Sequence, residues 1–292
     1  MMADALNRQR GPALEPAYWL AKRITGASLE QSYRNTLYCV EVLRQESGKL
    51  SGHYCGNRWC LVCASIRTGR AWNNYMPILK TWREKQFVTL TIQNVNGEQL
   101  RGTIGEIIWV LTWIKKEIAR RYGVELVGIR KLECTYNAER GDFHPHVHMV
   151  VEDKPMACLV TMLWLDAWAG LAASNAQKIV AANNNSVGEL FKYFTKLVTK
   201  RKMMAPPALD TIFRAMRRRQ VFRSFGFTLP KADDESDELT FEQGTHAPTR
   251  RDESIVWDWV EGATDWVDLQ TGECLSEYEP TAGFRAFVES IG

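Results

Sequence analysis

The chain has 292 residues, 45% of them hydrophobic and 24% charged, a composition typical of a globular protein with one large or two modest domains. The polar start, with Asp4, Asn7 and Arg8, lacks the apolar core of a signal peptide. The most apolar run, residues 155–173, is interrupted by Asp166, which favours a buried helix over a membrane span. We therefore expect a cytoplasmic protein with no membrane partner.

Charge is distributed unevenly along the chain. The formal net charge is +3, but residues 233–292 hold sixteen acidic and three basic residues, a balance of −13 that leaves +16 for residues 1–232. A basic body with an acidic tail indicates a polyanionic partner for the body. The alternative, a merely solvated charged surface, rarely produces so lopsided a split.

Residues 1–35 are weakly patterned and are expected to form an N-terminal extension, and residues 36–75 contain a cysteine group. Its members are Cys39, Cys55, Cys60 and Cys63. Because a reducing cytosol disfavours disulfides, CxxxxCxxC spacing with one upstream cysteine predicts a tetrahedral zinc knuckle. His53 could replace one cysteine, and Arg58 is a candidate contact for a phosphate. The alternative is scattered buried thiols, which fits Cys134, Cys158 and Cys274 better.

A strand, a helix and a hairpin are predicted next. Residues 86–94 alternate as a β-strand does, residues 104–122 place apolar side chains at helical spacing, and residues 126–136 predict a second strand. A turn at residues 138–142 leads into Phe143-His144-Pro145-His146-Val147-His148-Met149-Val150-Val151. The last two strands should therefore form a hairpin.

Three histidines of the last strand, His144, His146 and His148, lie on one face because side chains alternate along a strand. A turn centred on residues 139–140 places Glu133 directly opposite His146 and diagonal to His148. One carboxylate with two or three imidazoles predicts a site for Mn²⁺ or Mg²⁺. The alternatives are hydrogen-bonded structural histidines and an exposed Glu133, which a one-residue slip would turn to the other face.

Further along, Ser186 and Glu189 have the spacing of a capping box and predict a helix from Ser186 to about Lys200. Tyr193 falls at the border of its apolar face, one turn after Glu189. A boundary aromatic and a simple helix cap are the alternatives to catalytic roles for these two residues. Those alternatives weaken beside a metal-binding strand, since a metal-bound phosphodiester near lysines could activate a phenol.

The end of the basic body and the acidic tail differ sharply. Residues 201–223 are strongly basic and include Arg217 and Arg218, which indicates a helix that binds a nucleic-acid backbone, with a solvated charged face as an equal alternative. Residues 231–250 predict an acidic linker. Residues 251–292 predict a small β appendage in which we find no chemistry.

Four motifs, in this order, resemble the rolling-circle replication initiators of small bacterial plasmids, within the HUH endonuclease superfamily. They are the knuckle at Cys55–Cys63, with Leu61 where Pro is usual, the strand Phe87–Asn94, His144-Pro145-His146-Val147-His148, and Glu189-x-x-x-Tyr193-x-x-Lys196. Each motif alone is weak, but the ordered set is specific. The resemblance covers about residues 39–230 and is to the single-tyrosine branch with a cysteine zinc knuckle.

The resemblance implies a metal site and a nucleophile. His146 and His148 with Glu133, and His144 as a second choice, would hold the divalent ion that polarises the scissile phosphate. Tyr193 would attack single-stranded or cruciform origin DNA, leaving a 5′-phosphotyrosyl link and a free 3′-OH for a host polymerase. Because this exchange conserves bond energy, no ATP is needed, and the sequence contains no GxxxxGK[ST] segment. A host helicase would unwind the duplex.

The resemblance also gives roles to residues around the tyrosine. Lys196 would position or neutralise the phosphate, and Glu189 would activate water in the terminating hydrolysis. With a single nucleophile, the closing step needs either water or a second subunit, as in a homodimer. Lys200, Arg217 and Arg218 are the DNA-binding candidates of this region.

The implied fold is α+β, with residues 76–230 as an HUH endonuclease domain beside the knuckle and the acidic C-terminal appendage. That domain would be a central antiparallel sheet with the histidine strand in its middle and helices on one face, a split βαβ (ferredoxin-like) arrangement. Two other functions remain open. A transposase or relaxase of the same superfamily would share the chemistry, whereas a non-catalytic zinc-knuckle regulator would bind nucleic acid without forming a covalent adduct.

Overall fold

The computed structural model describes residues 10, 17–24, 26, 29–46, 49–191, 198–199, 202–203, 205–227, 255–260, 263, 265–268, 270–276 and 279. Three predicted site residues, Tyr193, Lys196 and Lys200, lie outside this set, as does the predicted acidic linker, and the side chain of Glu189 is not described either. The chain divides into two compact units, residues 1–67 with 238–292 and residues 68–237. Each unit is described by itself below.

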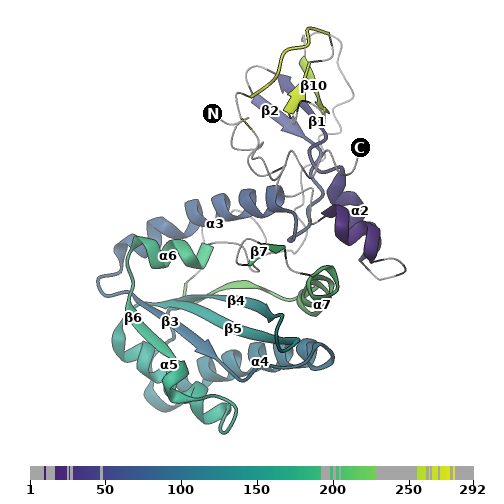
Figure 1. The fold of residues 1–292 in the computed structure, drawn as a ribbon. Helices are drawn as coiled ribbons and strands as arrows, with labels where there is room; N and C mark the ends of the chain where they lie inside the picture. Colours follow the sequence, from purple (N-terminus) through teal and green to yellow (C-terminus); the bar gives the residue numbers. More distant parts are fainter. Residues whose placement is uncertain are drawn as a thin grey trace. The chain divides into compact units, whose positions relative to one another are not determined.

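The first unit is built on a four-stranded antiparallel sheet of order β11-β10-β1-β2 (Figure 1). Its elements are α2 (Glu30–Leu37), β1 (Val42–Glu46), β2 (Lys49–Gly52), the first residues of α3 (Leu61–Thr81), β10 (Ile255–Val260) and β11 (Asp265–Val267). The C-terminal strands thus pair with the region predicted to be the knuckle. Large apolar rings explain the pairing, because Trp257 and Trp266 are buried in one core cluster with Val40 and Leu43.

The second unit contains a five-stranded antiparallel sheet of order β6-β3-β5-β4-β9, so the histidine strand is central, as predicted. Its strands are β3 (Gln86–Thr91), β4 (Gly128–Asn137), β5 (Asp142–Val151), β6 (Lys178–Ala181) and β9 (Phe222–Phe225). Strands β3 and β4 both run antiparallel to β5, and α4 (Gly97–Tyr122) lies between them in the chain. The protein is therefore α+β with antiparallel sheets.

Helices cover both faces of this sheet, which corrects the expectation of helices on one face (Figure 1). Helices α4 and α5 (Lys154–Ala167) pack on the face where Val147 and Met149 are fully buried. On the histidine face, Tyr75 of α3 and Phe191 of α6 (Asn184–Phe191) pack with Phe87, next to Val150. Helices α3 and α6 cover this face because it also carries the apolar residues Phe87 and Val150, whose burial is favourable.

Helix boundaries differ from the sequence expectation where caps were misjudged. Helix α4 begins at Gly97, not near residue 104, because the Asn96 side chain accepts a hydrogen bond from the Gln99 amide at 2.9 Å. It ends at Gly123, whose φ of 66° forms a left-handed C-cap. Asp153 caps α5 by accepting from the Met156 amide at 2.7 Å, and α5 ends at Ala167 rather than at residue 173.

The region around the predicted tyrosine helix needs two corrections. Helix α6 begins at Asn184, so Ser186 lies inside the helix and is not its N-cap, and the capping-box prediction was wrong. The helix also does not continue to Lys200, because Val198–Thr199 form β7, paired with β8 (Lys202–Met203). The basic segment that follows contains α7 (Pro206–Met216) and then β9.

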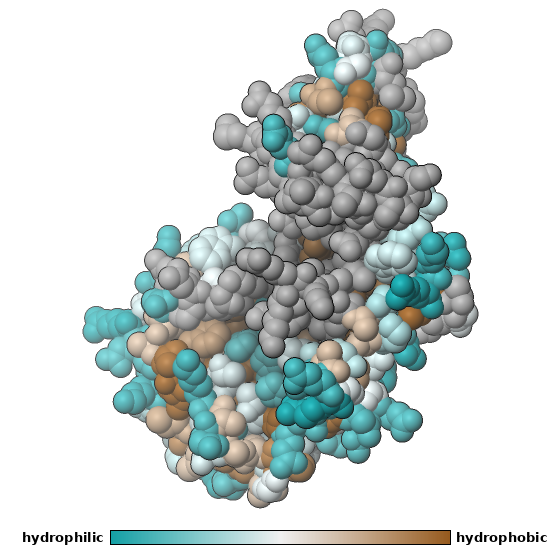
Figure 2. Space-filling model, in the orientation of Figure 1, coloured by the Kyte–Doolittle hydropathy of each residue, from teal (hydrophilic) through white to brown (hydrophobic). Residues whose placement is uncertain are grey.

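On the face shown in Figure 2, hydrophobic and hydrophilic residues are interspersed over the second unit. Its exposed large apolar side chains include Trp109 of α4, Met162 of α5 and Val180 of β6. Within the described part of the chain, no helix is both long enough and apolar enough to cross a bilayer.

Candidate functional site

Strands β4 and β5 carry the first candidate site. Their register places Glu133 directly opposite His146 and Lys131 opposite His148, so His148 lies on the diagonal from Glu133, as the sequence predicted. All these side chains share the sheet face that also carries Thr89 of β3, which pairs with His148. The tight turn at residues 138–141 fixes the register, since the Asn137 side chain accepts hydrogen bonds from two amides within it.

Three ligand-type atoms converge in this site. His146 Nε2 lies 3.5 Å and His148 Nε2 lies 3.7 Å from the same Glu133 oxygen, Oε2. These three residues form a group whose donor atoms all lie within 4.8 Å of one another. The side chains are 12%, 11% and 19% exposed for Glu133, His146 and His148, so the group is largely shielded from solvent.

The far nitrogens of the two imidazoles are held by the protein. His146 Nδ1 lies 3.1 Å from the carbonyl oxygen of His144, which can only accept, so Nδ1 carries the proton. In the neutral ring that a metal ion requires, the lone pair is on Nε2, which faces Glu133; with no ion bound, a proton on Nε2 can donate to the carboxylate instead. His148 Nδ1 lies 3.2 Å from the Thr89 hydroxyl, which can donate or accept, so this contact orients the second ring without fixing its tautomer. Metal-ligating histidines are oriented in this way.

Lys131 stabilises the ionised form of the Glu133 carboxylate. Its ammonium lies 2.7 Å from Glu133 Oε1, and its side chain is only 3% exposed. Burial alone would raise the pKa of Glu133, but the hydrogen bond with His146 and the charge of Lys131 outweigh burial and hold the pKa at about 2. Sequence reasoning missed Lys131, although its position two residues before Glu133 on one strand placed it on the same face.

His144 is on the same face but does not join the group. It pairs with Thr135, and its ring stacks at 5.1 Å from His146. Burial and the neighbouring His146 lower its pKa, so the neutral ring is favoured. Its backbone carbonyl lies 3.1 Å from His146 Nδ1, and its ring contacts His146 only by stacking. Of the described residues, the carboxylate–imidazole group therefore contains Glu133, His146 and His148 without His144.

The second candidate site is the predicted cysteine group, and its four thiols come together. The sulfur of Cys63 lies 3.6 Å from that of Cys39 and 3.7 Å from that of Cys55. A disulfide needs about 2.0 Å, whereas sulfurs bound tetrahedrally to one zinc ion at about 2.3 Å lie about 3.8 Å apart. The thiol spacing fits zinc, and His53, which is exposed, is not in the group.

Local structure presents these thiols. Gly56 adopts a φ of 67°, which turns the chain between Cys55 and the start of α3. Cys63 lies in the first turn of α3, where hydrogen bonding with Cys39 and Cys55, together with burial, raises the pKa of its thiol. Hydrogen bonding with its neighbouring thiols lowers the pKa of Cys55, whereas the same neighbours and burial raise the pKa of Cys60. A bound cation would displace the protons that the buried thiols otherwise keep.

The tail contributes to this site, which sequence reasoning missed. The cysteines share a core cluster with Trp257 and Trp266, and the Trp266 indole donates to the carbonyl of Val40 at 2.8 Å. Val40 follows Cys39 directly and adopts a φ of 58°. Three tryptophans among acidic residues were the available signal, because indoles in a short segment need a core to cover them.

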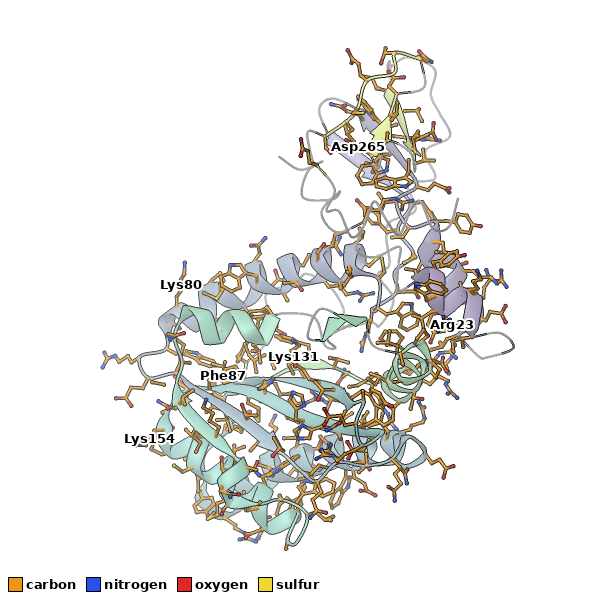
Figure 3. All side chains as sticks on the ribbon, viewed as in Figure 1. Arg23, Lys80, Phe87, Lys131, Lys154 and Asp265 are labelled. Carbon is orange, nitrogen blue, oxygen red and sulfur yellow. The ribbon has the colours of Figure 1, made fainter. Side chains whose placement is uncertain are left out.

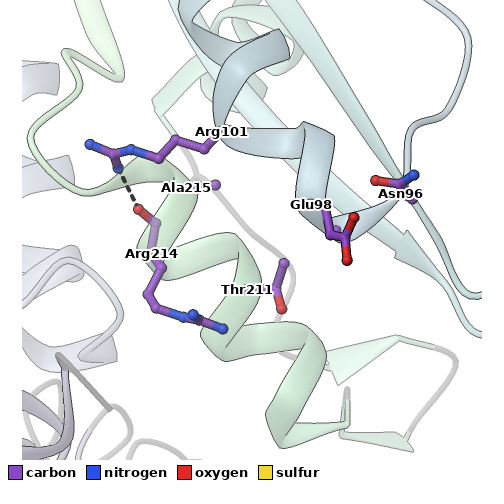
Figure 4. A pocket seen from close by; sticks show the side chains of 7 residues that line it. Asn96, Glu98, Arg101, Thr211, Arg214 and Ala215 are labelled. Carbon is purple, nitrogen blue, oxygen red and sulfur yellow. Dashed lines mark hydrogen bonds between the residues drawn. The ribbon is translucent and has the colours of Figure 1, made fainter.

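The DNA-binding candidates that are described lie on the surface. Arg58 is half-buried in the first unit, whereas Arg217 and Arg218 are exposed after α7 in the second unit. A groove between the start of α4 and α7 lies near this segment (Figure 4). In it, Arg101 donates to the carbonyl of Arg214 at 2.8 Å. The groove carries both charge signs, because Glu98 also lines it.

Comparison with known proteins places these sites in context. A family model described as "Replication protein" matches residues 48–158. That range includes the last three cysteines of the group and all of the Glu133–His146–His148 group, and it ends before Tyr193. No solved structure matches the chain.

Three similar proteins are each named "Protein rep". The one from Staphylococcus aureus is 31% identical over 174 residues, which are 51% of this chain and 74% of the relative. The one from Streptococcus pneumoniae serotype 2 (strain D39) is 29% identical over 158 residues, 46% of this chain and 48% of the relative. The one from a Bacillus species is 31% identical over 126 residues, 39% of this chain and 40% of the relative. The match thus spans half or less of the latter two relatives.

Proposed function

The chain belongs to the Rep family of plasmid replication initiators, and from this premise we propose that it is a metal-dependent, site-specific DNA nickase that starts rolling-circle replication. In this proposal residues 76–230 form the HUH endonuclease domain. Its split βαβ unit is β3–α4–β4, in which β5 lies between β3 and β4 in the sheet. The substrate is single-stranded or cruciform origin DNA. Host helicase and polymerase are the partners.

One observation carries the proposal, the convergence of Glu133, His146 and His148 on one face of the central sheet. Two imidazole nitrogens and one carboxylate oxygen are a mixed donor set that suits Mn²⁺ or Mg²⁺. Three protein donors also leave coordination positions for a substrate, as a catalytic site requires. A bound divalent ion would supply Lewis acidity at the phosphate.

The covalent step is assigned to Tyr193. Its phenolate oxygen attacks phosphorus, the bond from phosphorus to the 3′ oxygen breaks, and the leaving oxygen takes a proton to become the 3′-OH. The products are a 5′-phosphotyrosyl link and a primer end. Lys196 would neutralise charge on the phosphate, and Glu189 would activate water to close the cycle with a single tyrosine. A second subunit of a homodimer is the alternative closing nucleophile.

Chain connectivity supports the choice of Tyr193. Phe191, the last residue of α6, packs with Phe87, whose ring lies 5.2 Å from that of His148. The ring of Phe191 also lies 5.3 Å from the ring of Phe222, and Phe222 of β9 pairs with Lys131 of β4. Phe191, which lies two residues before Tyr193 in the sequence, thus packs on the sheet face that carries the Glu133–His146–His148 group, and this supports the assignment.

The proposal is tested with labelled single-stranded oligonucleotides from the plasmid origin, in Mn²⁺. Label on the 3′ side of the nick should enter a protein adduct that survives boiling in detergent, whereas label on the 5′ side should appear as a shorter strand with a 3′-OH. Tyr193→Phe should abolish the adduct and keep oligonucleotide binding.

Two controls separate this proposal from its alternatives. If wild-type protein binds the oligonucleotides but forms no adduct on any origin-derived strand, the nickase proposal is wrong and a non-catalytic regulator explains the fold. For Glu189→Ala we expect nicking with accumulated adduct or multimeric products. Unchanged termination would remove Glu189 from the mechanism.

A further inference from the structure

Lys131 is unusual because burying a lysine ammonium costs desolvation free energy unless the charge is paired. Its side chain is 3% exposed and lies on the same sheet face as the Glu133–His146–His148 group. Figure 3 labels it among the side chains of the sheet. Its ammonium pairs with Glu133 Oε1 at 2.7 Å. A buried ion pair is a weak source of stability, since desolvation offsets the attraction. Stability alone therefore gives a poor reason for a lysine at this position.

The contacts of Glu133 suggest another reason. Its two oxygens are divided, Oε1 toward Lys131 and Oε2 toward both imidazole nitrogens. The pairing of β4 with β5 sets Lys131 across from His148 and Glu133 across from His146, so the four side chains form a square. On its other side Lys131 pairs with Phe222 of β9. The ammonium is thus enclosed beside the place where an ion would bind.

We propose that Lys131 is a positioning residue that tunes this metal site, holding Glu133 as a one-oxygen ligand and keeping the occupied site strongly cationic. The inference rests on the proposed function. The charges of Lys131 and Glu133 cancel and the two imidazoles are neutral, so a bound divalent ion retains its full charge. Without the lysine, the carboxylate would halve that charge.

Two consequences follow from Coulomb's law in a poorly solvated site. The ammonium repels the ion, so the ion binds more weakly than it would to the same three ligands alone. The positive charge that remains favours an anionic phosphodiester beside the ion. Lys131 therefore lowers the affinity of the site for the ion and raises its affinity for the phosphate. Loss of Lys131 should tighten ion binding. A merely structural lysine would have the opposite effect, because its loss would loosen the ligands.

Calorimetric titration of the full chain with Mn²⁺ tests the sign of this effect. We expect Lys131→Met to bind Mn²⁺ about tenfold more tightly or better, a change of about one unit of log K. Lys131→Arg keeps the charge and should stay within about threefold of wild type. Lys131→Gln keeps an N–H donor without the charge, and it should also tighten binding, which separates charge from packing and provides a second neutral variant.

A second readout follows the substrate. With Mn²⁺ present and Tyr193 changed to Phe in every protein to prevent reaction, Lys131→Met should bind a single-stranded origin oligonucleotide about tenfold more weakly. Equal or weaker Mn²⁺ binding by both neutral variants, with circular dichroism unchanged, would overturn the inference and leave the nickase proposal intact. If wild-type protein and Glu133→Gln bind Mn²⁺ equally poorly, the metal site and this inference both fail.

Discussion

The two side-chain groups that could hold metal ions differ in every feature that decides what a bound ion can do. The cysteine group offers four sulfurs, is mostly buried and packs against two tryptophans. The Glu133–His146–His148 group offers one oxygen and two nitrogens, and its side chains remain 11–19% exposed. Four thiolates fill the coordination of zinc, whereas three N/O donors leave positions free. We infer that the first group stabilises its unit and that chemistry belongs to the second.

The neighbours of each group sharpen this difference. The cysteines lie in a unit built on a small four-stranded sheet with short elements, which has few other sources of stability. The histidines lie on the central strand of a five-stranded sheet covered by helices on both faces. A fold that does not depend on its ion can use that ion for catalysis. Loss of metal should therefore unfold the first unit and leave the second intact.

The largest expected effect is that of Cys60→Ser. Structural zinc contributes on the order of 10 kcal/mol to small zinc domains, so the variant should lose zinc and the folded structure of residues 29–67. Metal analysis and near-ultraviolet circular dichroism of the tryptophans measure both. Cys158→Ser is the matched control, since Cys158 is exposed on α5 and outside the group. Wild-type protein without zinc would contradict the assignment of the cysteine group.

His146→Ala should remove metal binding from the second unit without unfolding it. Losing one of three protein ligands should weaken Mn²⁺ binding at least about 100-fold, since even outer-shell changes cost 10–100-fold. His144→Ala is the control on the same strand and face, because alanine keeps the backbone carbonyl that lies 3.1 Å from His146 Nδ1 and removes only a ring that is outside the ligand group. Calorimetry on both variants measures the contrast. Equal losses would mean that His144 is a ligand after all.

Trp266→Phe tests whether the tail supports the cysteine group. Phenylalanine keeps most of the buried ring but leaves the Val40 carbonyl without the indole donor, which should lower the free energy of unfolding by about 1–3 kcal/mol. Chemical denaturation followed by tryptophan fluorescence measures this change. Zinc should also be lost faster to a chelator. An unchanged rate would separate the tail from the cysteine group.

Asn96→Ala should have the smallest effect and should be confined to the second unit. Loss of the cap on α4 should destabilise this unit by about 1 kcal/mol, a shift of about 2–4 °C in melting temperature for a domain of this size. Asn96→Asp retains the acceptor and is the control. Mn²⁺ affinity should be unchanged in both, since the cap lies outside the metal group. A change in affinity would show that α4 positions the ligands.

The hairpin was predictable because its turn fixed the register and the side-chain period of two then fixed the face. Glu133 and His146 followed from local rules alone. Proline is unusual in a central strand because it cannot donate a backbone hydrogen bond. Pro145 is tolerated here since the pairing of β3 with β5 ends at Thr91 and His146, one residue short of it. The thiol spacing likewise predicted the cysteine group.

What the sequence did not disclose depends on distant contacts. The pairing of β10 with β1 joins residues more than 200 positions apart, and no local pattern encodes it. The cover of the histidine face by α3 and α6 comes from apolar residues on three separated segments. Lys131 was overlooked because lysine is usually exposed, and only the sheet on both sides of β4 buries it.

Mass spectrometry of the covalent complex tests the central claim most directly. Wild-type protein reacted with a single-stranded origin oligonucleotide in Mn²⁺, then digested with trypsin and nuclease, should yield one peptide that carries a nucleotide phosphate on Tyr193. His146→Ala and a chelator should each abolish that peptide. A nucleotide on any other residue, or none on any peptide while the oligonucleotide is bound, would contradict the account.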